Sequence, residues 1–399
     1  MKSIDGQINL RVLNNTTLPQ PVSILSTIPN INSANNSNVL YEFNLTGQVY
    51  TGVTNVNINI SNTSNPTIVV YNAPVYTQSI QGVVDALNSL NQGIFSYSGT
   101  TIYVSSSYYI YSNISISGTS ILGTTGTNPV ALLVNSLGNV FTANSNSNDV
   151  SKITPSGVST IFALVGNVPS DIVIDATGNL YTPDAGSNQV SKITPLGVPS
   201  VFAITGNVPA CITIDTAGNV YTANLGGNNL TKITTLGVPT NYGNLNGQNP
   251  QGMVIDSAGN VFVVCSANVV RKITSAGVST DFGVFPIGNI LVGIAIDSLD
   301  NIYVSNNTNQ IIYKLTPSAV QTTYGTSTSQ PQKITIDSSN NIYCVNQNAT
   351  IDKILATGGT TTISDLSLLG GSGYGIALDT YNNVYVTDYN LNLVYLIVQ

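Results

Sequence analysis

One sequence block recurs seven times, and this repetition limits the possible fold more than any other feature of the chain. The blocks read VNSLGNVF, IDATGNLY, IDTAGNVY, IDSAGNVF, IDSLDNIY, IDSSNNIY and LDTYNNVY. Successive copies lie 40 to 42 residues apart, as measured between the shared asparagines Asn139, Asn179, Asn219, Asn260, Asn301, Asn341 and Asn383. Repeats of this length, built from short apolar runs between turn signals, are typical of the four-stranded blades of a β-propeller.

The second copy shows how four strands fit into one period. Alternating apolar and polar residues predict strands over 171–175, 180–184, 190–194 and 200–204, separated by Gly, Asn and Pro turns. The last copy ends after its third strand at Gln399, whereas SISGTSILGTTGTNP, before the first copy, looks like a fourth strand with its exit loop. The sequence therefore predicts a mainly β fold, a seven-bladed propeller over residues 116–399 closed by an N-terminal strand.

The first 115 residues lack the repeat and are expected to form a separate small α+β domain. The runs VLYEFNL, NVNINIS and TIVVYN alternate like strands, and IFSYSGTTIYV predicts a hairpin that turns at Ser98 and Gly99. A helix is expected from Ser79 to Asn91, because its apolar residues fall on one face.

Most charged residues follow the repeat, which favours a structural role for them. One third-strand position carries Lys152, Lys192, Lys232, Lys272, Lys314 and Lys353. A turn position carries Asp175, Asp215, Asp256, Asp297, Asp337 and Asp379, where a short carboxylate can cap the turn. The three cysteines, Cys211, Cys265 and Cys344, stand at strand positions in different repeats and are expected to be core residues.

A ring of polar residues five positions after each shared asparagine is the candidate ligand-binding site. It consists of Asn144, Asp184, Asn224, Asn306, Asn346 and Asp388, with Cys265 in the fourth repeat. The loops that follow are rich in amides, hydroxyls and glycine, and we expect them to share one propeller face with the loops that lead into each first strand. Such groups can hydrogen-bond a glycan, or they can satisfy the backbone of the turns.

The block I-D-x-x-G-N-[VIL]-[YF], followed by a V-x-K-I-T strand, resembles the NHL repeat and is similar to the propeller of virginiamycin B lyases. The resemblance implies a propeller fold and, for the lyases, catalysis by histidine and a metal. This chain contains no histidine. We therefore assign no catalytic residue, no metal site and no cofactor, and we expect a protein that is not an enzyme.

The segments LPQPVSIL and VVDALNSLNQGIFSYSGTTIYV resemble virion structural proteins of phages that infect Bacteroidetes. This resemblance implies a virion surface spike or fibre, with an N-terminal domain that binds the capsid or forms a homo-oligomer and a propeller that meets a host glycan or receptor. A propeller enzyme of the lyase or lactonase type and a bacterial surface adhesin are the alternatives.

Charge and hydropathy exclude two further classes of partner. Only 10 basic residues are present and the net charge is −7, so no cationic stripe is expected to bind nucleic acid. The start MKSIDGQINL lacks the apolar core of a secretory signal, and no later run suits a membrane span. We therefore expect no membrane insertion.

Overall fold

The computed structural model describes residues 119–399 in full, except residue 267, and before them the strands alone. The chain divides into two compact units, one of residues 123–153 and 159–395, the other of residues 1–122, 154–158 and 396–399. Among the described residues, none of the helices has the length and apolar character needed to cross a membrane.

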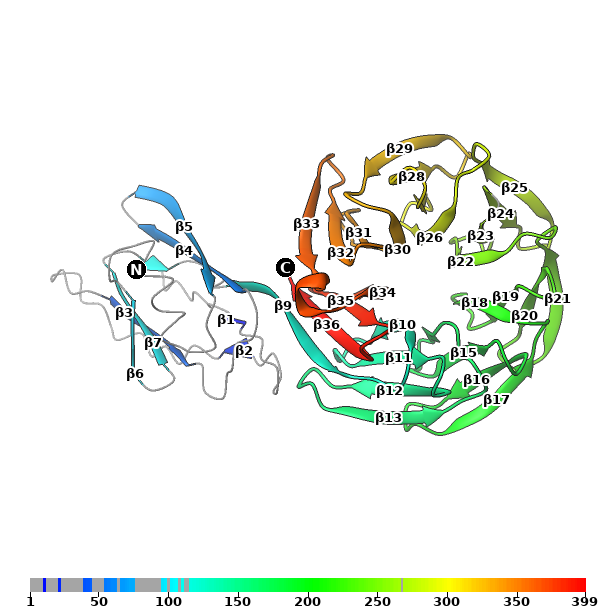
Figure 1. The fold of residues 1–399 in the computed structure, drawn as a ribbon, viewed down its shortest axis with the longest axis horizontal. Helices are drawn as coiled ribbons and strands as arrows, with labels where there is room; N and C mark the ends of the chain where they lie inside the picture. Colours follow the sequence, from blue (N-terminus) through cyan, green and yellow to red (C-terminus); the bar gives the residue numbers. More distant parts are fainter. Residues whose placement is uncertain are drawn as a thin grey trace. The chain divides into compact units, whose positions relative to one another are not determined.

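Six four-stranded antiparallel sheets follow one another along the chain and form blades 1 to 6 of a ring (Figure 1). Blades 1 to 3 consist of β10 Pro129–Val134, β11 Val140–Asn144, β12 Asp149–Ile153 and β13 Ser159–Leu164; β14 Val173–Ile174, β15 Leu180–Asp184, β16 Gln189–Ile193 and β17 Pro199–Ile204; β18 Pro209–Ile214, β19 Val220–Asn224, β20 Asn229–Ile233 and β21 Pro239–Asn244. Blades 4 to 6 consist of β22 Pro250–Ile255, β23 Val261–Cys265, β24 Val269–Ile273 and β25 Ser279–Val284; β26 Leu291–Ile296, β27 Ile302–Asn306, β28 Ile311–Leu315 and β29 Gln321–Thr326; β30 Pro331–Ile336, β31 Ile342–Asn346, β32 Thr350–Ile354 and β33 Thr360–Asp365. One 3-10 helix, η1 Leu366–Leu369, leads from blade 6 to blade 7.

Blade 7 takes its strands from both ends of the repeat region. It contains β34 Gly373–Leu378, β35 Val384–Asp388 and β36 Leu393–Val398, and the next strand in this sheet is β9 Ser115–Thr124. The predicted closing strand is therefore confirmed, as is the seven-bladed propeller.

A repeated backbone hydrogen bond shows that β9 takes the place of a fourth strand. In blade 1 the N–H of Val165, just after the fourth strand, donates to the carbonyl of Asn148, just before the third. Blade 7 makes the same bond from Thr125, just after β9, to the carbonyl of Asn392 at 2.9 Å. The other blades repeat it in the pairs Thr205–Asn188, Leu245–Asn228, Phe285–Asn268, Ser327–Gln310 and Leu366–Ala349.

The hydrophobic core of the propeller lies between neighbouring blades. One cluster joins Tyr181 and Val190 of blade 2 to Ile212 and Val220 of blade 3, and equivalent clusters join blades 1 and 2, 3 and 4, 4 and 5, and 5 and 6. In blades 1 to 5, the aromatic residue near the start of the second strand therefore packs between blades. Each blade depends on its neighbours to cover its apolar faces.

The first strand of blade 2 is shorter than the sequence predicts. The alternating pattern predicts a strand over 171–175, but β14 contains only Val173 and Ile174. Its partner strand β15 carries Pro183, which has no N–H to donate to the ladder. Pairing before Val173 is reduced to an isolated bridge between Pro169 and Asp184.

Several predicted strands of the first 115 residues are present, but the structure does not test the predicted α+β domain. The described strands are β1 Leu10–Arg11, β2 Pro21–Val22, β3 Val39–Asn44, β4 Thr54–Asn62, β5 Asn65–Val75, β6 Phe95–Ser98, β7 Thr101–Ser106 and β8 Tyr109–Ile110. The predicted hairpin of β6 and β7 is present, but Ser98 pairs with Thr101 and so belongs to the strand rather than to the turn predicted at Ser98 and Gly99. The helix expected from Ser79 to Asn91 lies outside the described residues, so the domain and its boundary at residue 115 stay predictions.

Removal of β9 should destabilise the propeller. A chain that begins at Ile116 keeps this strand, whereas one that begins at Pro129 loses its hydrogen bonds to β36 and the buried side chain of Leu122. We expect the shorter chain to be less stable by a few kcal/mol. Thermal unfolding of the two purified chains measures the difference, and equal melting temperatures would contradict the role given to β9.

Candidate functional site

A hydrogen-bonded Asp–Asn turn joins the first and second strands in blades 2 to 7. In blade 2, Asp175 accepts from the backbone N–H of Asn179 at 2.9 Å, from its side-chain amide at 2.8 Å and from the hydroxyl of Tyr181 at 3.0 Å. Burial alone would raise the pKa of Asp175, but the hydrogen bonds from Asn179, Thr177 and Tyr181 outweigh it and lower the pKa to about 2. The structural role predicted for these carboxylates is therefore confirmed.

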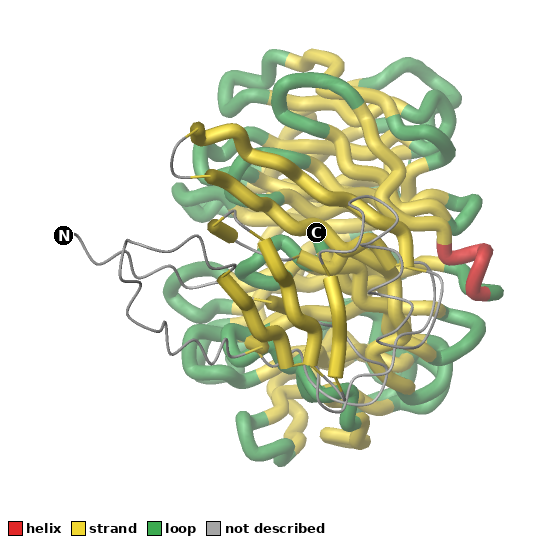
Figure 2. Tube along the Cα trace, turned by 90° about the vertical axis from the view of Figure 1, so that its left-hand side faces the viewer, coloured by secondary structure: helices red, strands yellow, loops and turns green. Residues whose placement is uncertain are grey.

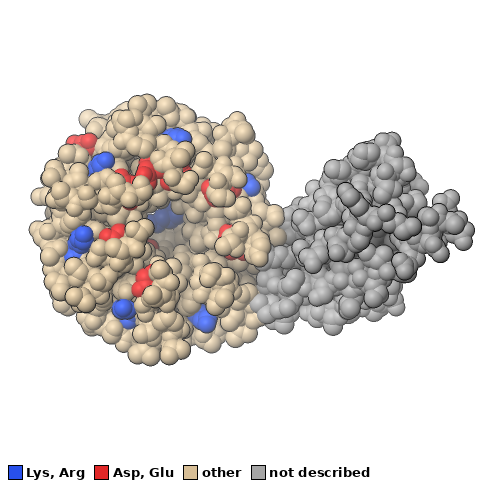
Figure 3. All heavy atoms as spheres, turned by 180° about the vertical axis from the view of Figure 1, so that it is seen from behind, with Lys and Arg blue, Asp and Glu red and all other residues tan. Residues whose placement is uncertain are grey.

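The repeated lysines are also part of the scaffold. The ammonium group of Lys232 lies 5.3 Å from the ring centres of both Tyr221 and Tyr242, which meet edge to face. Lys152, Lys192 and Lys272 each lie over two rings in the same way. Each of these cation–π contacts keeps a lysine over the rings of its own blade. Figure 3 shows basic side chains spaced around the ring rather than gathered in one patch.

The six candidate ligand-binding residues are almost completely buried. Each ends the second strand of its blade, and none is more than 1% exposed: Asn144, Asp184, Asn224, Asn306, Asn346 and Asp388. In this conformation they contact neighbouring protein groups rather than solvent. Whether the ring or the loops above it bind a ligand stays a prediction.

The hydrogen bonds of these buried residues hold the loops of one propeller face. Asp184 accepts from Ser191 at 2.6 Å and from the N–H of Gly166 in the loop that leads into blade 2, at 3.1 Å. Asp388 accepts from the N–H of Ser372, in the loop that leads into blade 7, at 2.8 Å. Burial raises the pKa of Asp184 against the lowering effect of its hydroxyl partners. These contacts match the turn-stabilising alternative.

The loops that follow the second strands do share a face with those that lead into the first strands. Backbone N–H groups of Ser145, Ala185 and Leu225 donate to carbonyls of Asn128, Val168 and Val208, respectively. Seen edge-on, the loops lie on the two faces of the ring, and η1 lies on one of them (Figure 2). The loops that follow the second strands and those that lead into the first strands therefore form one face of the propeller, the amide-rich face.

A first-strand position near the centre of the ring carries an ionisable group in three of the seven blades. Four blades have Ala or Gly there, whereas blades 2, 3 and 6 have Asp171, Cys211 and Lys333. The ammonium of Lys333 donates to the carbonyl of Gln251 in blade 4 at 3.0 Å. Asp171 is partly buried, and desolvation raises its pKa, partly offset by the charge of Lys333.

The cysteines behave as core residues, as predicted. All three are buried free thiols, and desolvation raises the pKa of Cys211, Cys265 and Cys344 to about 12. A thiolate is the reactive form of cysteine, so these side chains are unreactive near neutral pH. Among the described residues, no group of three or more Cys, Asp or Glu side chains is placed to hold a metal ion.

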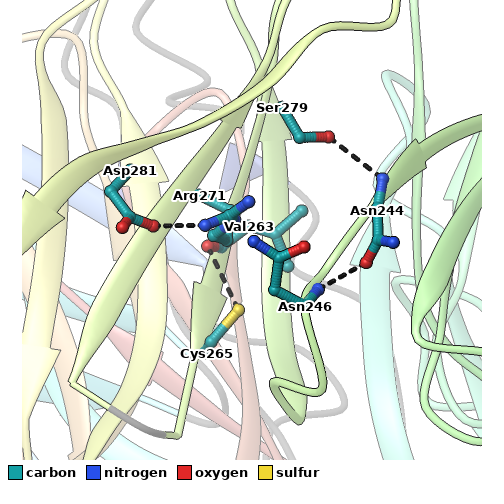
Figure 4. A network of polar contacts seen from close by, with 7 residues as sticks. All are labelled: Asn244, Asn246, Val263, Cys265, Arg271, Ser279 and Asp281. Atoms are coloured by element: carbon teal, nitrogen blue, oxygen red, sulfur yellow. Dashed lines mark hydrogen bonds and ion pairs between the residues drawn. The ribbon is translucent and has the colours of Figure 1, made fainter.

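Blade 4 departs from the repeat at a buried arginine. Arg271 stands where blades 1 to 3 have Ser151, Ser191 and Thr231, and it forms an ion pair with Asp281 on the neighbouring strand (Figure 4). Its side chain is only 6% exposed. Alignment of the third strands column by column would have revealed this residue, because it is the only basic side chain in a column of Ser, Thr, Tyr and Asp.

Solved structures similar to this chain are seven-bladed propellers of the virginiamycin B lyase type. Virginiamycin B lyase from Staphylococcus aureus is 19% identical, with a TM-score of 0.64 over 71% of this chain and 99% of that one. A streptogramin B lyase is 17% identical, with a TM-score of 0.62 over 71% and 98%. The WD40 propeller domain of Doa1 is 12% identical, with a TM-score of 0.57 over 71% and 97%.

A further structure is the Staphylococcus aureus lyase with quinupristin, in a form described as catalytically inactive, in which alanine replaces a histidine. No family model and no curated protein matches the chain. At these identities the likeness establishes the propeller fold alone.

The Asp–Asn turns should make stability depend on acid pH. The folded pKa of Asp175, about 2, lies below its unfolded value of about 4, so its contribution is complete above pH 4 and is lost as the pH falls toward 2. Asp175→Asn should cost about 1 kcal/mol at pH 6 and much less near pH 2. Asn135 of blade 1, which accepts the same backbone hydrogen bonds, shows that asparagine fits this turn. Chemical unfolding at the two pH values measures the effect, and a pH-independent difference would contradict it.

The lysine contacts should contribute to stability in proportion to the rings they face. Lys232 lies over two rings, whereas Lys353 lies over Tyr343, with Ile363 at the second ring position. Replacement by methionine keeps the aliphatic stem and removes the charge. We expect Lys232→Met to cost about 1 kcal/mol and Lys353→Met about half as much. Equal losses in urea unfolding would show that the second ring adds nothing.

Proposed function

We propose that this chain is a non-enzymatic recognition protein on the surface of a virion, and that its propeller binds a glycan on the host cell. One observation carries the proposal: the ionisable groups of the repeat are used in scaffold contacts, while the loop face offers amides and hydroxyls. Asp175 and its equivalents accept several hydrogen bonds, and Lys232 and its equivalents lie over aromatic rings. Neutral donors and acceptors suit a polyhydroxylated ligand.

The fold similarity to lyases does not by itself favour catalysis. In the Staphylococcus aureus lyase, a variant that has lost one histidine is described as inactive, and this chain has no histidine at all. A propeller enzyme built on this sequence would need another general acid or base near the centre of the ring. Lys333 and Asp171 are the residues on which that alternative would be tested.

The virion role is supported by the first 115 residues. Their segments LPQPVSIL and VVDALNSLNQGIFSYSGTTIYV resemble phage virion proteins, and this would make the capsid or another virion protein the partner of the N-terminal region. A homo-oligomer would multiply weak glycan contacts, since linked sites gain affinity without new contacts. A bacterial surface adhesin is the alternative, and the presence or absence of the chain in purified particles distinguishes the two.

Purified full-length chain should compete with virus particles for adsorption to the host cell without altering the material it binds. Each neutral hydrogen bond contributes roughly 0.5 to 1.5 kcal/mol, so single-site binding should be weak and the oligomer should compete better than the monomer. Adsorption counts against chain concentration measure the competition. Failure to compete even as an oligomer would overturn the recognition role, and release of a modified glycan would favour the enzyme.

The same competition should depend little on salt. Few charges are available on the amide-rich face, so there is little for salt to screen between about 0.05 and 0.5 M. We expect less than a twofold change in the half-effective concentration. A collapse of competition in moderate salt would show that charged contacts, not neutral hydrogen bonds, carry the binding.

A further inference from the structure

An open polar groove lies between blades 3 and 4, next to one member of the buried ring, because its lining residue Asn229 accepts a hydrogen bond from the side-chain amide of Asn224 at 3.0 Å. Its volume is about 620 Å³, within the range of about 300 to 1,000 Å³ that is usual for small-molecule sites. It is lined by Asn229 and Tyr242 of blade 3, Asn246 of the loop that leads into blade 4, and Arg271 and Ser279 of blade 4. Figure 4 shows Asn246 beside Arg271, and the hydroxyl of Ser279 turned toward the backbone N–H of Asn244, from which it accepts at 3.0 Å.

The repeat is broken at several positions around this one groove. Arg271 is basic at a position that carries serine or threonine in blades 1 to 3 and tyrosine or aspartate in blades 5 to 7. Its cross-strand partner Asp281 is charged where blades 1 to 3, 5 and 6 carry Ile, Val, Asn or Thr, and Cys265 replaces the ring residue. Asn246, with a φ of 54°, stands where the loops into blades 1 to 3 carry Gly126, Gly166 and Gly206. Because these departures from the repeat lie close together, they indicate a function of this region that the scaffold does not need.

The charge of Arg271 is neutralised inside the groove, and its guanidinium is held firmly. One terminal nitrogen donates to Asp281. With its amide oxygen turned toward the arginine, Asn246 accepts from the two terminal nitrogens at 3.2 and 2.8 Å. The Nε of Arg271 is buried and donates to no group among the described residues. An anion would have to approach the carboxylate of Asp281, so the site favours a neutral ligand.

The groove also contains an asparagine, Asn228, whose counterparts in blades 1 and 2 are used in scaffold hydrogen bonds. Asn148 and Asn188 accept from the N–H groups of Val168 and Val208 in the next blade at 2.8 and 2.7 Å. Their counterpart in blade 3, Asn228, makes no such side-chain bond within the described part of the chain, and it lines the groove. On β21, Asn241 and Asn244 are exposed and line it as well.

From this arrangement we infer that the groove between blades 3 and 4 is the saccharide-binding site of the propeller, and that it selects a neutral sugar. The asparagine amides would pair with sugar hydroxyls as both donors and acceptors, and the Arg271–Asp281 pair would hold the floor of the groove in place. This inference rests on the proposed recognition function and places it in the groove rather than at the buried ring.

The test titrates the full-length chain with glucose, galactose, mannose and N-acetylglucosamine, and with glucuronic acid as the charged counterpart of glucose. Ligand-observed NMR measures each dissociation constant. We expect a neutral sugar to bind in the millimolar range, and Asn241→Ala with Asn244→Ala to weaken it at least tenfold. The matched control is Thr323→Ala with Thr326→Ala, at the same positions of β29, and it should stay within twofold of the parent chain.

A second variant removes the Arg271–Asp281 ion pair and leaves neither charge without its partner. Arg271→Ser with Asp281→Val installs the pair that blade 2 carries, Ser191 and Val201, so we expect it to fold and to lose at least tenfold in sugar affinity. Binding of glucuronic acid alone, unchanged binding by the asparagine variant, or no binding of any neutral sugar would each overturn the inference.

The adsorption assay separates this inference from the proposed function. If the parent chain competes for host adsorption and the asparagine variant competes equally well, recognition stands but the groove is not its site. If neutral sugars bind in the groove and the parent chain does not compete, the groove assignment holds and the virion role fails.

Discussion

Burial between blades is the constraint on which the rest of this structure depends. A four-stranded sheet cannot cover its own two apolar faces, and here the clusters around Tyr181 and Phe262 draw residues from two successive blades. A row of such sheets would leave its first and last faces open, so the ring has to close. The chain closes it with β9, which stands beside β36 and repeats the backbone bond from Thr125 to Asn392 that every other blade makes.

The few charged residues of the repeat make the same scaffold contacts in successive blades, and this determines which groups are left for the surface. The carboxylates tie each turn to the asparagine and, in five blades, the tyrosine of the following strand, and the lysines lie over aromatic rings. With most ionisable groups used in this way, the loops present amides, hydroxyls and glycine. Such a surface binds by neutral hydrogen bonds and therefore gains most from repetition of the site.

Positions where the repeat fails are more informative about function than those where it holds. The Asn and Asp ring repeats in six blades and is buried beneath the loops, as a structural element would be. Blade 4 and the loop that leads into it instead place Arg271 and Asn246 in a single groove, with Asp281 paired to Arg271. Near the centre of the ring, Asp171, Cys211 and Lys333 form a second set of departures, and desolvation raises the pKa values of the Asp171 carboxyl and the Cys211 thiol.

The sequence by itself determined the number of blades, the strands of each period, the closing segment and the turn role of residues such as Asp215, because these follow from local rules. Alternation of period two, turn chemistry and the spacing of copies are all visible along the chain. Only the tertiary structure decided which polar residues face solvent. Asn144 and Asn241 are the same residue type at the end or in the middle of a strand, yet Asn144 is completely buried and donates to Asp149 and Ser151, whereas Asn241 is exposed and lines an open groove. The packing of neighbouring strands and blades, not the propensity of asparagine itself, sets this difference in exposure.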